Sequence, residues 1–211
     1  MYRYRITYKK EYNLRYTGNL DIQKIWERSF RRAKLPLSYS KGFHPQPKII
    51  QALPLPLGYT SECEMIDIWF DCELSITNIN NSLLDHIHQG LGILIIENIE
   101  IQSPKIQNIV RSVDYQCVFN NKYQPEDIKF KFDTLTNSDN ILWNRRGKNF
   151  NLKQHIINIA MSTVPENFVL NMVLKALPGQ TGRPDEILSY LGVDPSITHI
   201  HRTNLTIDNS V

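Results

Sequence analysis

The chain begins with alternating apolar and polar positions. Between residues 2 and 9, tyrosine or isoleucine occupies every even position, and arginine, threonine or lysine occupies every odd one. A period of two with β-favouring residues is typical of a strand that buries one face. The pattern therefore predicts a first β-strand at the N-terminus.

A helical period follows this strand. Asn19 or Asp21 can cap a helix that runs to about Ala33, and Pro36 prevents its continuation. The apolar residues that would form its stripe are Leu20, Ile25, Trp26 and Phe30.

The rest of the first half contains further segments in which apolar residues have the spacing of a strand or of a helix. The predicted elements are an extended segment from Ile49 to Leu53, a turn at residues 54–58, a strand from Glu62 to Phe70, a helix from Ser75 to Gln89 and a strand from Leu91 to Ile101. Together with the first strand and helix, these elements give the order βαββαβ.

The second half repeats this order with one extra element. The predicted elements are a strand from Val110 to Phe119, a helix from Pro125 to Leu135, a short segment from Ile141 to Asn144, a hairpin of Leu152–Met161 and Phe168–Leu177 around a turn at residues 164–167, a helix from Arg183 to Leu191 and a strand from Ile197 to Ile207.

The order βαββαβ is that of the ferredoxin-like unit, in which two helices cover one face of a four-stranded antiparallel sheet. We therefore predict an α+β protein made of two tandem ferredoxin-like halves with antiparallel sheets. A basic N-terminal half would comprise residues 1–108, and a C-terminal half would comprise residues 109–211. One continuous mixed sheet is the alternative, and it is also α+β.

Composition narrows the class of protein. With 211 residues, 41% of them hydrophobic, the chain can bury a substantial core. The longest aliphatic run, Leu91 to Ile96, is far shorter than the roughly 20 residues of a membrane span, and the alternating N-terminus does not resemble a secretory signal. We expect a cytoplasmic protein, or one in the stroma-like compartment of an organelle, with no membrane partner.

The cysteines favour the same compartment. Cys63, Cys72 and Cys117 are an odd, scattered set without neighbouring Cys or His partners. This pattern favours reduced thiols that pack as small hydrophobic groups. We expect neither a metal site nor a cofactor in this chain.

Charge is distributed unevenly along the chain. The first fifty residues hold 12 Lys and Arg against 3 Asp and Glu, a net charge of +9, whereas the remainder holds 12 against 18, a net charge of −6. A local excess of this size indicates a site for a polyanion, although an acidic protein surface could also complete it.

The basic region starts with a turn and a helix. Arg15 precedes Gly18, which permits a tight turn, and Asp21 lies at the start of the predicted helix. Helical spacing places four cations on one face, where they would either be solvated or contact phosphates. These cations are Lys24, Arg28, Arg31 and Arg32.

A loop that mixes aromatic and basic residues follows the helix. Tyr39, Phe43 and His44 could stack on bases while Lys41 and Lys48 meet phosphates, as in proteins that bind single-stranded nucleic acid. The alternative is that Phe43 fills the core. His44 is the group here that could act as a base near neutral pH, but a single histidine does not define a catalytic site.

A third segment lies far along the sequence. Gly179 and Gly182 surround a short turn, and Arg183 directly precedes a predicted helix whose free N–H groups could receive an anion. A simple helix cap is the alternative. The segment lacks the GxxxxGK[ST] order of a nucleotide-binding loop.

Read in order, these segments resemble the radical-SAM-linked family, a domain found alone or C-terminal to cobalamin-binding radical SAM proteins. The resemblance is dense over the first seventy residues, and Asn19 departs from it because the family often has His there. The matching residues are Arg15–Asp21, Glu27–Ala33, Leu35–Pro36, Tyr39–Ser40, Gly42–Pro45, Pro47–Lys48, Ala52–Pro56, Gly58, Ser61–Glu62, Glu64 and Pro178–Leu188.

This resemblance implies a radical SAM protein as partner. Radical SAM catalysis needs an iron–sulfur cluster held by closely spaced cysteines, and the chain has no CxxxCxxC motif. The family is also similar in its segment order to tandem ferredoxin-like RNA-processing proteins of CRISPR systems. The implied role is therefore an accessory one, with the chemistry in another chain.

Three functional hypotheses follow. The first is an accessory RNA-binding module that acts beside a radical SAM enzyme in RNA modification or processing. The second is a protein-interaction domain that docks a radical SAM partner without nucleic acid. The third is a metal-independent RNA endonuclease with His44 as base. The residues expected to bind RNA or a partner are Arg15, Asp21, Arg28, Arg31, Arg32, Tyr39, Lys41, Phe43, His44, Lys48 and Arg183.

Overall fold

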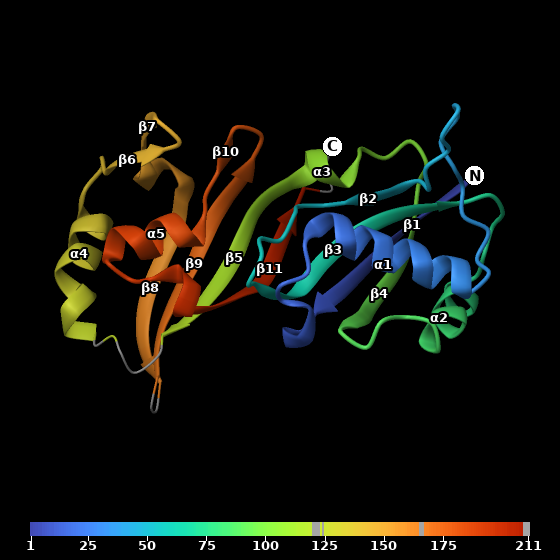
Figure 1. The fold of residues 1–211 in the computed structure, drawn as a ribbon. Helices are drawn as coiled ribbons and strands as arrows, with labels where there is room; N and C mark the ends of the chain where they lie inside the picture. The colour runs from blue at the N-terminus through green and yellow to red at the C-terminus, as the bar shows by residue number, and fades with distance from the viewer. Residues whose placement is uncertain (120–122, 124, 165–166, 209–211) are drawn as a thin grey trace. The chain divides into compact units, whose positions relative to one another are not determined.

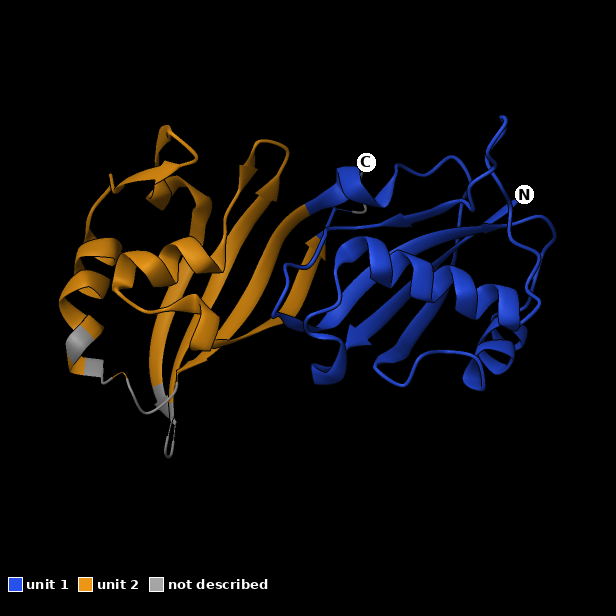
Figure 2. Cartoon of the chain, in the orientation of Figure 1, with its two compact units in different colours: residues 1–110, 207–211 blue, residues 111–206 orange. Residues whose placement is uncertain are grey.

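The chain folds into two compact units in a computed structural model that describes residues 1–119, 123, 125–164 and 167–208. Unit 1 comprises residues 1–110 and the residues from Ile207 onward, and unit 2 comprises residues 111–206 (Figure 2). The predicted domain boundary between residues 108 and 109 stays a prediction, because a compact unit of a folded chain need not fold by itself.

Unit 1 combines an antiparallel sheet with helices (Figure 1). Its elements are β1 (Tyr2–Lys10), the 3₁₀ turn η1 (Tyr12–Leu14), α1 (Asn19–Arg32), β2 (Ile49–Gln51), β3 (Thr60–Phe70), α2 (Ile76–Leu84), β4 (Leu91–Ile99) and α3 (Ile106–Ile109). The strands lie in the order β4-β1-β3-β2, and each neighbouring pair is antiparallel.

Helices α1 and α2 cover one face of this sheet. The core holds an aromatic cluster in which Trp26 of α1 contacts Tyr8 of β1 and Phe30, with ring centroids 5.0 and 5.4 Å apart. Ile79 and Leu83 of α2 belong to the same core. The packing of these side chains fixes the axis of α1 over the sheet.

The start of α1 differs from the prediction. Gly18 occupies the N-cap position and no side chain of the described residues caps the helix, so the expected cap by Asn19 or Asp21 is wrong. Leu20, which was expected in the apolar stripe, is 71% exposed. The stripe instead includes Ile22, which points toward the sheet side of the helix with Trp26 and Phe30.

The other face of the sheet carries a buried charge cluster. Asp67 of β3 accepts hydrogen bonds from Arg3 and Arg5 of β1, with Arg3 Nη2 at 2.5 Å and Arg5 Nε at 2.8 Å from its oxygens. The Arg3 guanidinium also donates to the carbonyl oxygens of Ser103 and Pro104, at 2.6 and 2.7 Å. Both faces of β1 are therefore buried, although its alternating sequence predicted one solvated face.

Strand β4 lies at the end of the strand order, beside β1. Its register with β1 shifts between Thr7 and Tyr8, opposite Ile95 and Ile93, which leaves Leu94 unpaired in the register. Leu94 and Ile95 are both about half exposed.

Unit 2 is also built from strands and helices. Its elements are β5 (Val110–Phe119), α4 (Pro125–Asn137), β6 (Leu142–Arg145), β7 (Lys148–Asn151), the 3₁₀ turn η2 (Leu152–His155), β8 (Ile156–Val164), β9 (Asn167–Leu177), β10 (Gln180–Thr181), α5 (Pro184–Leu191), the 3₁₀ turn η3 (Pro195–Ile197) and β11 (His199–Ile207). Strands β8, β9, β5 and β11 are neighbours in that order, β10 extends β9, and β6 pairs with β7 in a separate hairpin.

The predicted mixed α+β class with largely antiparallel sheets is confirmed. The second helix is shorter than predicted and ends at Leu84, and residues 152–155 form a 3₁₀ turn instead of the start of a strand. Residues 165 and 166 of the predicted turn at 164–167 lie outside the described residues. No helix in the described part of the chain is both long and apolar enough to cross a membrane.

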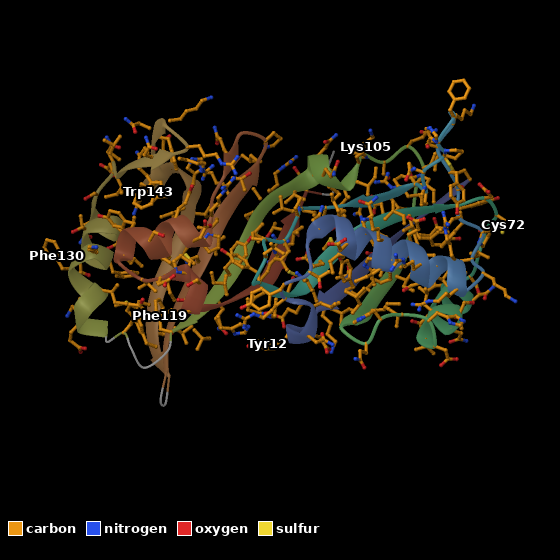
Figure 3. All side chains as sticks on the ribbon, in the orientation of Figure 1. Tyr12, Cys72, Lys105, Phe119, Phe130 and Trp143 are labelled. Carbon is orange, nitrogen blue, oxygen red and sulfur yellow. The ribbon has the colours of Figure 1, made fainter. Side chains whose placement is uncertain are left out.

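The cysteines only partly follow the prediction. Cys63 and Cys117 are buried, and burial raises the pKa of the Cys117 thiol well above its ordinary value. Cys72 is exposed, because β3 ends at Phe70 and leaves this residue beyond the sheet (Figure 3). The expectation that all three thiols pack as core groups is therefore wrong for Cys72.

Candidate nucleic-acid interface

Arg15 lies in the turn before α1, between two exposed tyrosine rings. Its guanidinium carbon is 4.6 Å from the ring centroid of Tyr12 and 4.5 Å from that of Tyr16, and its Nη2 donates to the Tyr16 hydroxyl oxygen. Its carbonyl oxygen accepts a hydrogen bond from the N–H of Gly58 at 2.8 Å. The backbone and both rings thus hold the charge of Arg15 in one place, with Tyr12 on the outside of unit 1 (Figure 3).

The cations of α1 have different surroundings. Lys24 lies 3.8 Å from Asp21, Arg31 pairs with Glu27 at 2.7 Å, and the Arg32 guanidinium donates to the carbonyl oxygen of His86 at 2.7 Å. Arg32 therefore ties the end of α1 to the segment after α2.

Arg28 is the cation of this face that remains available. It is exposed, and within the described residues it has no ion pair, hydrogen bond or ring contact. Its charge is thus the least neutralised of the four, since the other three are engaged by Asp21, Glu27 or a carbonyl oxygen.

The loop from Tyr39 to Lys48 forms a narrow hairpin, which we call the 39–48 loop. Tyr39 and Pro47 form an isolated antiparallel β-bridge. The Ser40 N–H donates to the Gln46 carbonyl oxygen at 2.8 Å, and the Gln46 N–H donates to the Ser40 hydroxyl oxygen at 2.9 Å. The Lys48 N–H closes the base by donating to the Ser38 carbonyl at 2.8 Å. These bonds leave residues 41–45 as an exposed tip.

Phe43 stands at this tip with its side chain 103% exposed. The alternative in which Phe43 fills the core is therefore wrong. Gly42 has a φ of +135°, a conformation that glycine adopts without strain and that turns the chain just before Phe43. Lys41 and His44 are exposed on either side of this pair.

The structure brings the 39–48 loop to one end of α1. The guanidinium of Arg31 lies 5.8 Å from the centroid of the Tyr39 ring, so the last turn of α1 and the loop form one surface. Arg15 lies before the other end of this 14-residue helix, about 20 Å away along its axis. Arg15 and the 39–48 loop therefore lie near opposite ends of α1.

Arg183 belongs to unit 2, where it is the N-cap residue of α5. The first turn of this short helix begins with Pro184 and carries the carboxylates of Asp185 and Glu186, and burial raises the pKa of the Asp185 carboxyl. These carboxylates of the chain itself lie where the predicted external anion would bind, and they oppose it by charge repulsion.

One polar cluster of unit 2 had no counterpart among the predicted sites. The Arg145 guanidinium holds both oxygens of Glu186, at 2.5 and 2.6 Å, and lies over the ring of Phe150. His155 packs edge-on against Phe150, with centroids 5.0 Å apart, and its buried Nδ1 has no hydrogen-bond partner among the described residues. The Arg146-Gly147 turn could have indicated the β6–β7 hairpin, but no sequence signal joins Arg145 to Glu186.

Acidification is expected to destabilise unit 2 through His155. Burial lowers the pKa of this imidazole below its ordinary value of about 6.5, and the charge of Arg145 lowers it further. The unfolded chain then binds a proton more readily than the folded one, so stability is lost as the pH falls below about 6.5. His155→Gln should flatten the dependence of the urea midpoint on pH between about pH 7.5 and 5. An equally steep dependence in the wild type and in His155→Gln would contradict this expectation.

The fold and this surface define a mixed α+β protein with an exposed basic and aromatic face. Residues 3–184 match the family described as "Uncharacterized protein conserved in bacteria (DUF2344)", and the chain belongs to this family. That description does not mention radical SAM enzymes, so the link to them stays a prediction.

Other comparisons add little to this assignment. No curated protein matches the chain. Among solved structures it is similar to "Crystal structure of putative glycine cleavage system transcriptional repressor", with 9% identity, 98% of each chain covered and a TM-score of 0.25. A TM-score this low does not indicate a shared fold. Among the described residues, no group of three or more His, Cys, Asp or Glu residues is placed to hold a metal ion.

Proposed function

We propose that this chain is an accessory RNA-binding protein that acts beside a radical SAM enzyme in RNA modification or processing. The observation that carries the proposal is the tip of the 39–48 loop, where the fully exposed ring of Phe43 stands between Lys41 and His44. Aromatic rings that stack on unpaired bases, beside cations that meet phosphates, are the combination used to hold single-stranded RNA.

The charge around this tip supports the same proposal. From Arg28 to Ser61 the sequence contains no Asp or Glu, while it contains six Lys and Arg residues. Arg28 has no partner within the described residues, and Arg31 stacks against Tyr39 at the base of the loop. A phosphate backbone that follows α1 toward the loop would neutralise this excess.

The fold is consistent with a nucleic-acid platform. Each unit has the main element order βαββαβ, with strand order β4-β1-β3-β2 in unit 1 and the equivalent β11-β5-β9-β8 in unit 2. This order supports the finer inference of two ferredoxin-like units, with the β6–β7 hairpin as an insertion in the second.

Removing the Phe43 ring is expected to weaken binding of single-stranded RNA by about 1–3 kcal/mol, the usual value of a base-stacking contact. The matched control is Phe130→Ala, because Phe130 is also highly exposed and lies on α4 of unit 2 (Figure 3).

Arg28→Glu should weaken RNA binding. It should also reduce the slope of log affinity against log salt concentration by the equivalent of about one phosphate contact. Lys129→Glu on α4 is the control for this variant.

Charge reversal at Arg28 alone tests RNA binding more specifically than simultaneous charge reversal at Arg28, Arg31 and Arg32. Reversing Arg31 would break its pair with Glu27, and reversing Arg32 would release the carbonyl of His86, so either change could disturb the fold. Fluorescence anisotropy with labelled RNA at about 50 and 200 mM salt measures both affinity and slope. Equal binding by the wild-type chain, Phe43→Ala and Arg28→Glu would contradict the proposal.

Absence of RNA binding even at low salt would instead favour the docking hypothesis. In that case the same cations would meet an acidic surface of the radical SAM partner, and nuclease treatment would not affect recovery of the complex. Metal-independent RNA cleavage that His44→Ala abolishes would favour the endonuclease hypothesis. His44 lies at the exposed tip, and no hydrogen-bond or ion-pair partner orients it within the described residues.

A further inference from the structure

A pocket of about 450 Å³ opens in unit 1 beside the base of the 39–48 loop. Its apolar lining residues include Met1, Pro47, Ile50 and Trp69, and two lysines, Lys48 and Lys105, also line it. Volumes of about 300–1,000 Å³ are typical of pockets that hold small ligands. The size suits one planar ring system together with a small polar group.

Trp69 is held firmly at this pocket. Its backbone N–H donates to the carbonyl oxygen of Lys48 at 3.2 Å, and its backbone carbonyl oxygen accepts a hydrogen bond from the N–H of Ser38 at 2.8 Å. Along the opposite edge of β3, Trp69 is the register partner of Arg3 in β1. The guanidinium carbon of Arg3 lies 5.3 Å from the centroid of the Trp69 ring. Since side chains alternate along a strand, Trp69 lies on the face opposite the helices, with Arg3 and Asp67.

The charge of the pocket is positive. Among the residues that the structure describes, no Asp or Glu lines it. The Lys48 ammonium lies 3.2 Å from the thioether sulfur of Met1, which is a weak partner, and the Lys105 ammonium has no partner within the described residues. Behind Trp69, the buried Arg3 and Arg5 share the single carboxylate of Asp67, which leaves one further positive charge.

These features select one class of ligand. A flat aromatic group would cover the Trp69 indole and the aliphatic walls, and an anion attached to it would be placed between Lys48 and Lys105. Among common cellular molecules a nucleoside phosphate combines both groups. Lys105 lines the pocket from a segment far from the loop in sequence. It is the N-cap residue of α3, and Figure 3 labels it beside this helix.

We propose that this pocket binds one nucleoside phosphate, with its base against Trp69 and its phosphate at Lys48 and Lys105. The nucleotide is either free in solution or a unit of an RNA chain, and only the second source rests on the proposed function. In an RNA complex the pocket would hold one base next to the strand that follows the 39–48 loop, and would supply a base-selective subsite.

Indole signals in ¹H–¹⁵N NMR spectra test this proposal on the full chain. The chain has three tryptophans, so the Trp69 signal is assigned by its loss in Trp69→Phe. Addition of AMP, GMP, CMP or UMP is expected to shift this signal, and inorganic phosphate or ribose 5-phosphate is expected to shift it much less. Lys105→Ala should weaken nucleotide binding by about tenfold, and Lys129→Ala should not.

The outcomes separate this proposal from the proposed function. A Trp69 signal unmoved by millimolar mononucleotides and by single-stranded RNA, or equal affinities of wild type and Lys105→Ala, would overturn the pocket assignment. RNA binding that still depends on Phe43 would then leave the proposed function intact. Conversely, mononucleotide binding that depends on Lys105, in a chain that binds no RNA, supports the pocket with a free nucleotide and contradicts the proposed function.

Discussion

Asp67→Asn is expected to lower the free energy of unfolding by about 3–5 kcal/mol, the cost of removing one partner from a buried ion pair. Asp67 is 0% exposed, and it is the carboxylate that both Arg3 and Arg5 contact. Asparagine has nearly the same shape, but it is neutral and turns N–H donors toward two guanidinium groups. The two buried arginines would then lose the negative charge of Asp67 that compensates them.

Urea denaturation followed by tryptophan fluorescence measures this change, because Trp26 and Trp69 both lie in unit 1. Asp85→Asn is the matched control, since Asp85 is an exposed residue at the C-cap of α2, and its effect should remain within about 0.5 kcal/mol. A midpoint for Asp67→Asn equal to that of the control would show that the cluster does not stabilise unit 1.

Trp26→Ala is the second change with a large expected effect, a loss of about 3–5 kcal/mol. The side chain is fully buried between Tyr8 and Phe30, and its removal leaves a large cavity under α1. The indole N–H has no hydrogen-bond partner within the described residues. Trp26→Phe should therefore cost less, because it keeps an aromatic ring and removes an unsatisfied donor.

Leu20→Ala provides the control for Trp26 on the same helix. Leu20 is mostly exposed, so its truncation should change the midpoint by no more than about 0.5 kcal/mol. Comparable losses for Leu20→Ala and Trp26→Ala would contradict the packing of α1 described above. The same denaturation experiment reports on both variants.

Much of the secondary structure could be predicted, because the spacing of apolar residues along a segment indicates whether it forms a strand or a helix. The alternation in β1 and the stripe with Trp26 and Phe30 identified a strand and a helix close to their observed bounds. The burial of Arg3 and Arg5 could not be predicted from that alternation. It depends on Asp67, more than sixty positions away, and on two carbonyls that follow β4.

The sequence indicated which residues could form the candidate site, but not the contacts that these residues make in the folded chain. The sequence indicated an exposed basic helix face, and Arg28 fits this description. It gave no sign that Arg32 would be tied to the carbonyl of His86, nor that Lys105 would meet Lys48 at one pocket, because both contacts join distant segments.

The register shift in β4 has a consequence for self-association. An outermost strand with apolar side chains such as Leu94 and Ile95 invites another chain to pair along it, which is a route to aggregates. The shift opposite Thr7 and Tyr8 interrupts the even spacing of the outward N–H and C=O groups. A strand of another chain could therefore form hydrogen bonds with β4 only over short stretches. The irregular register thus opposes aggregation along β4, although the exposed apolar side chains of this strand favour it.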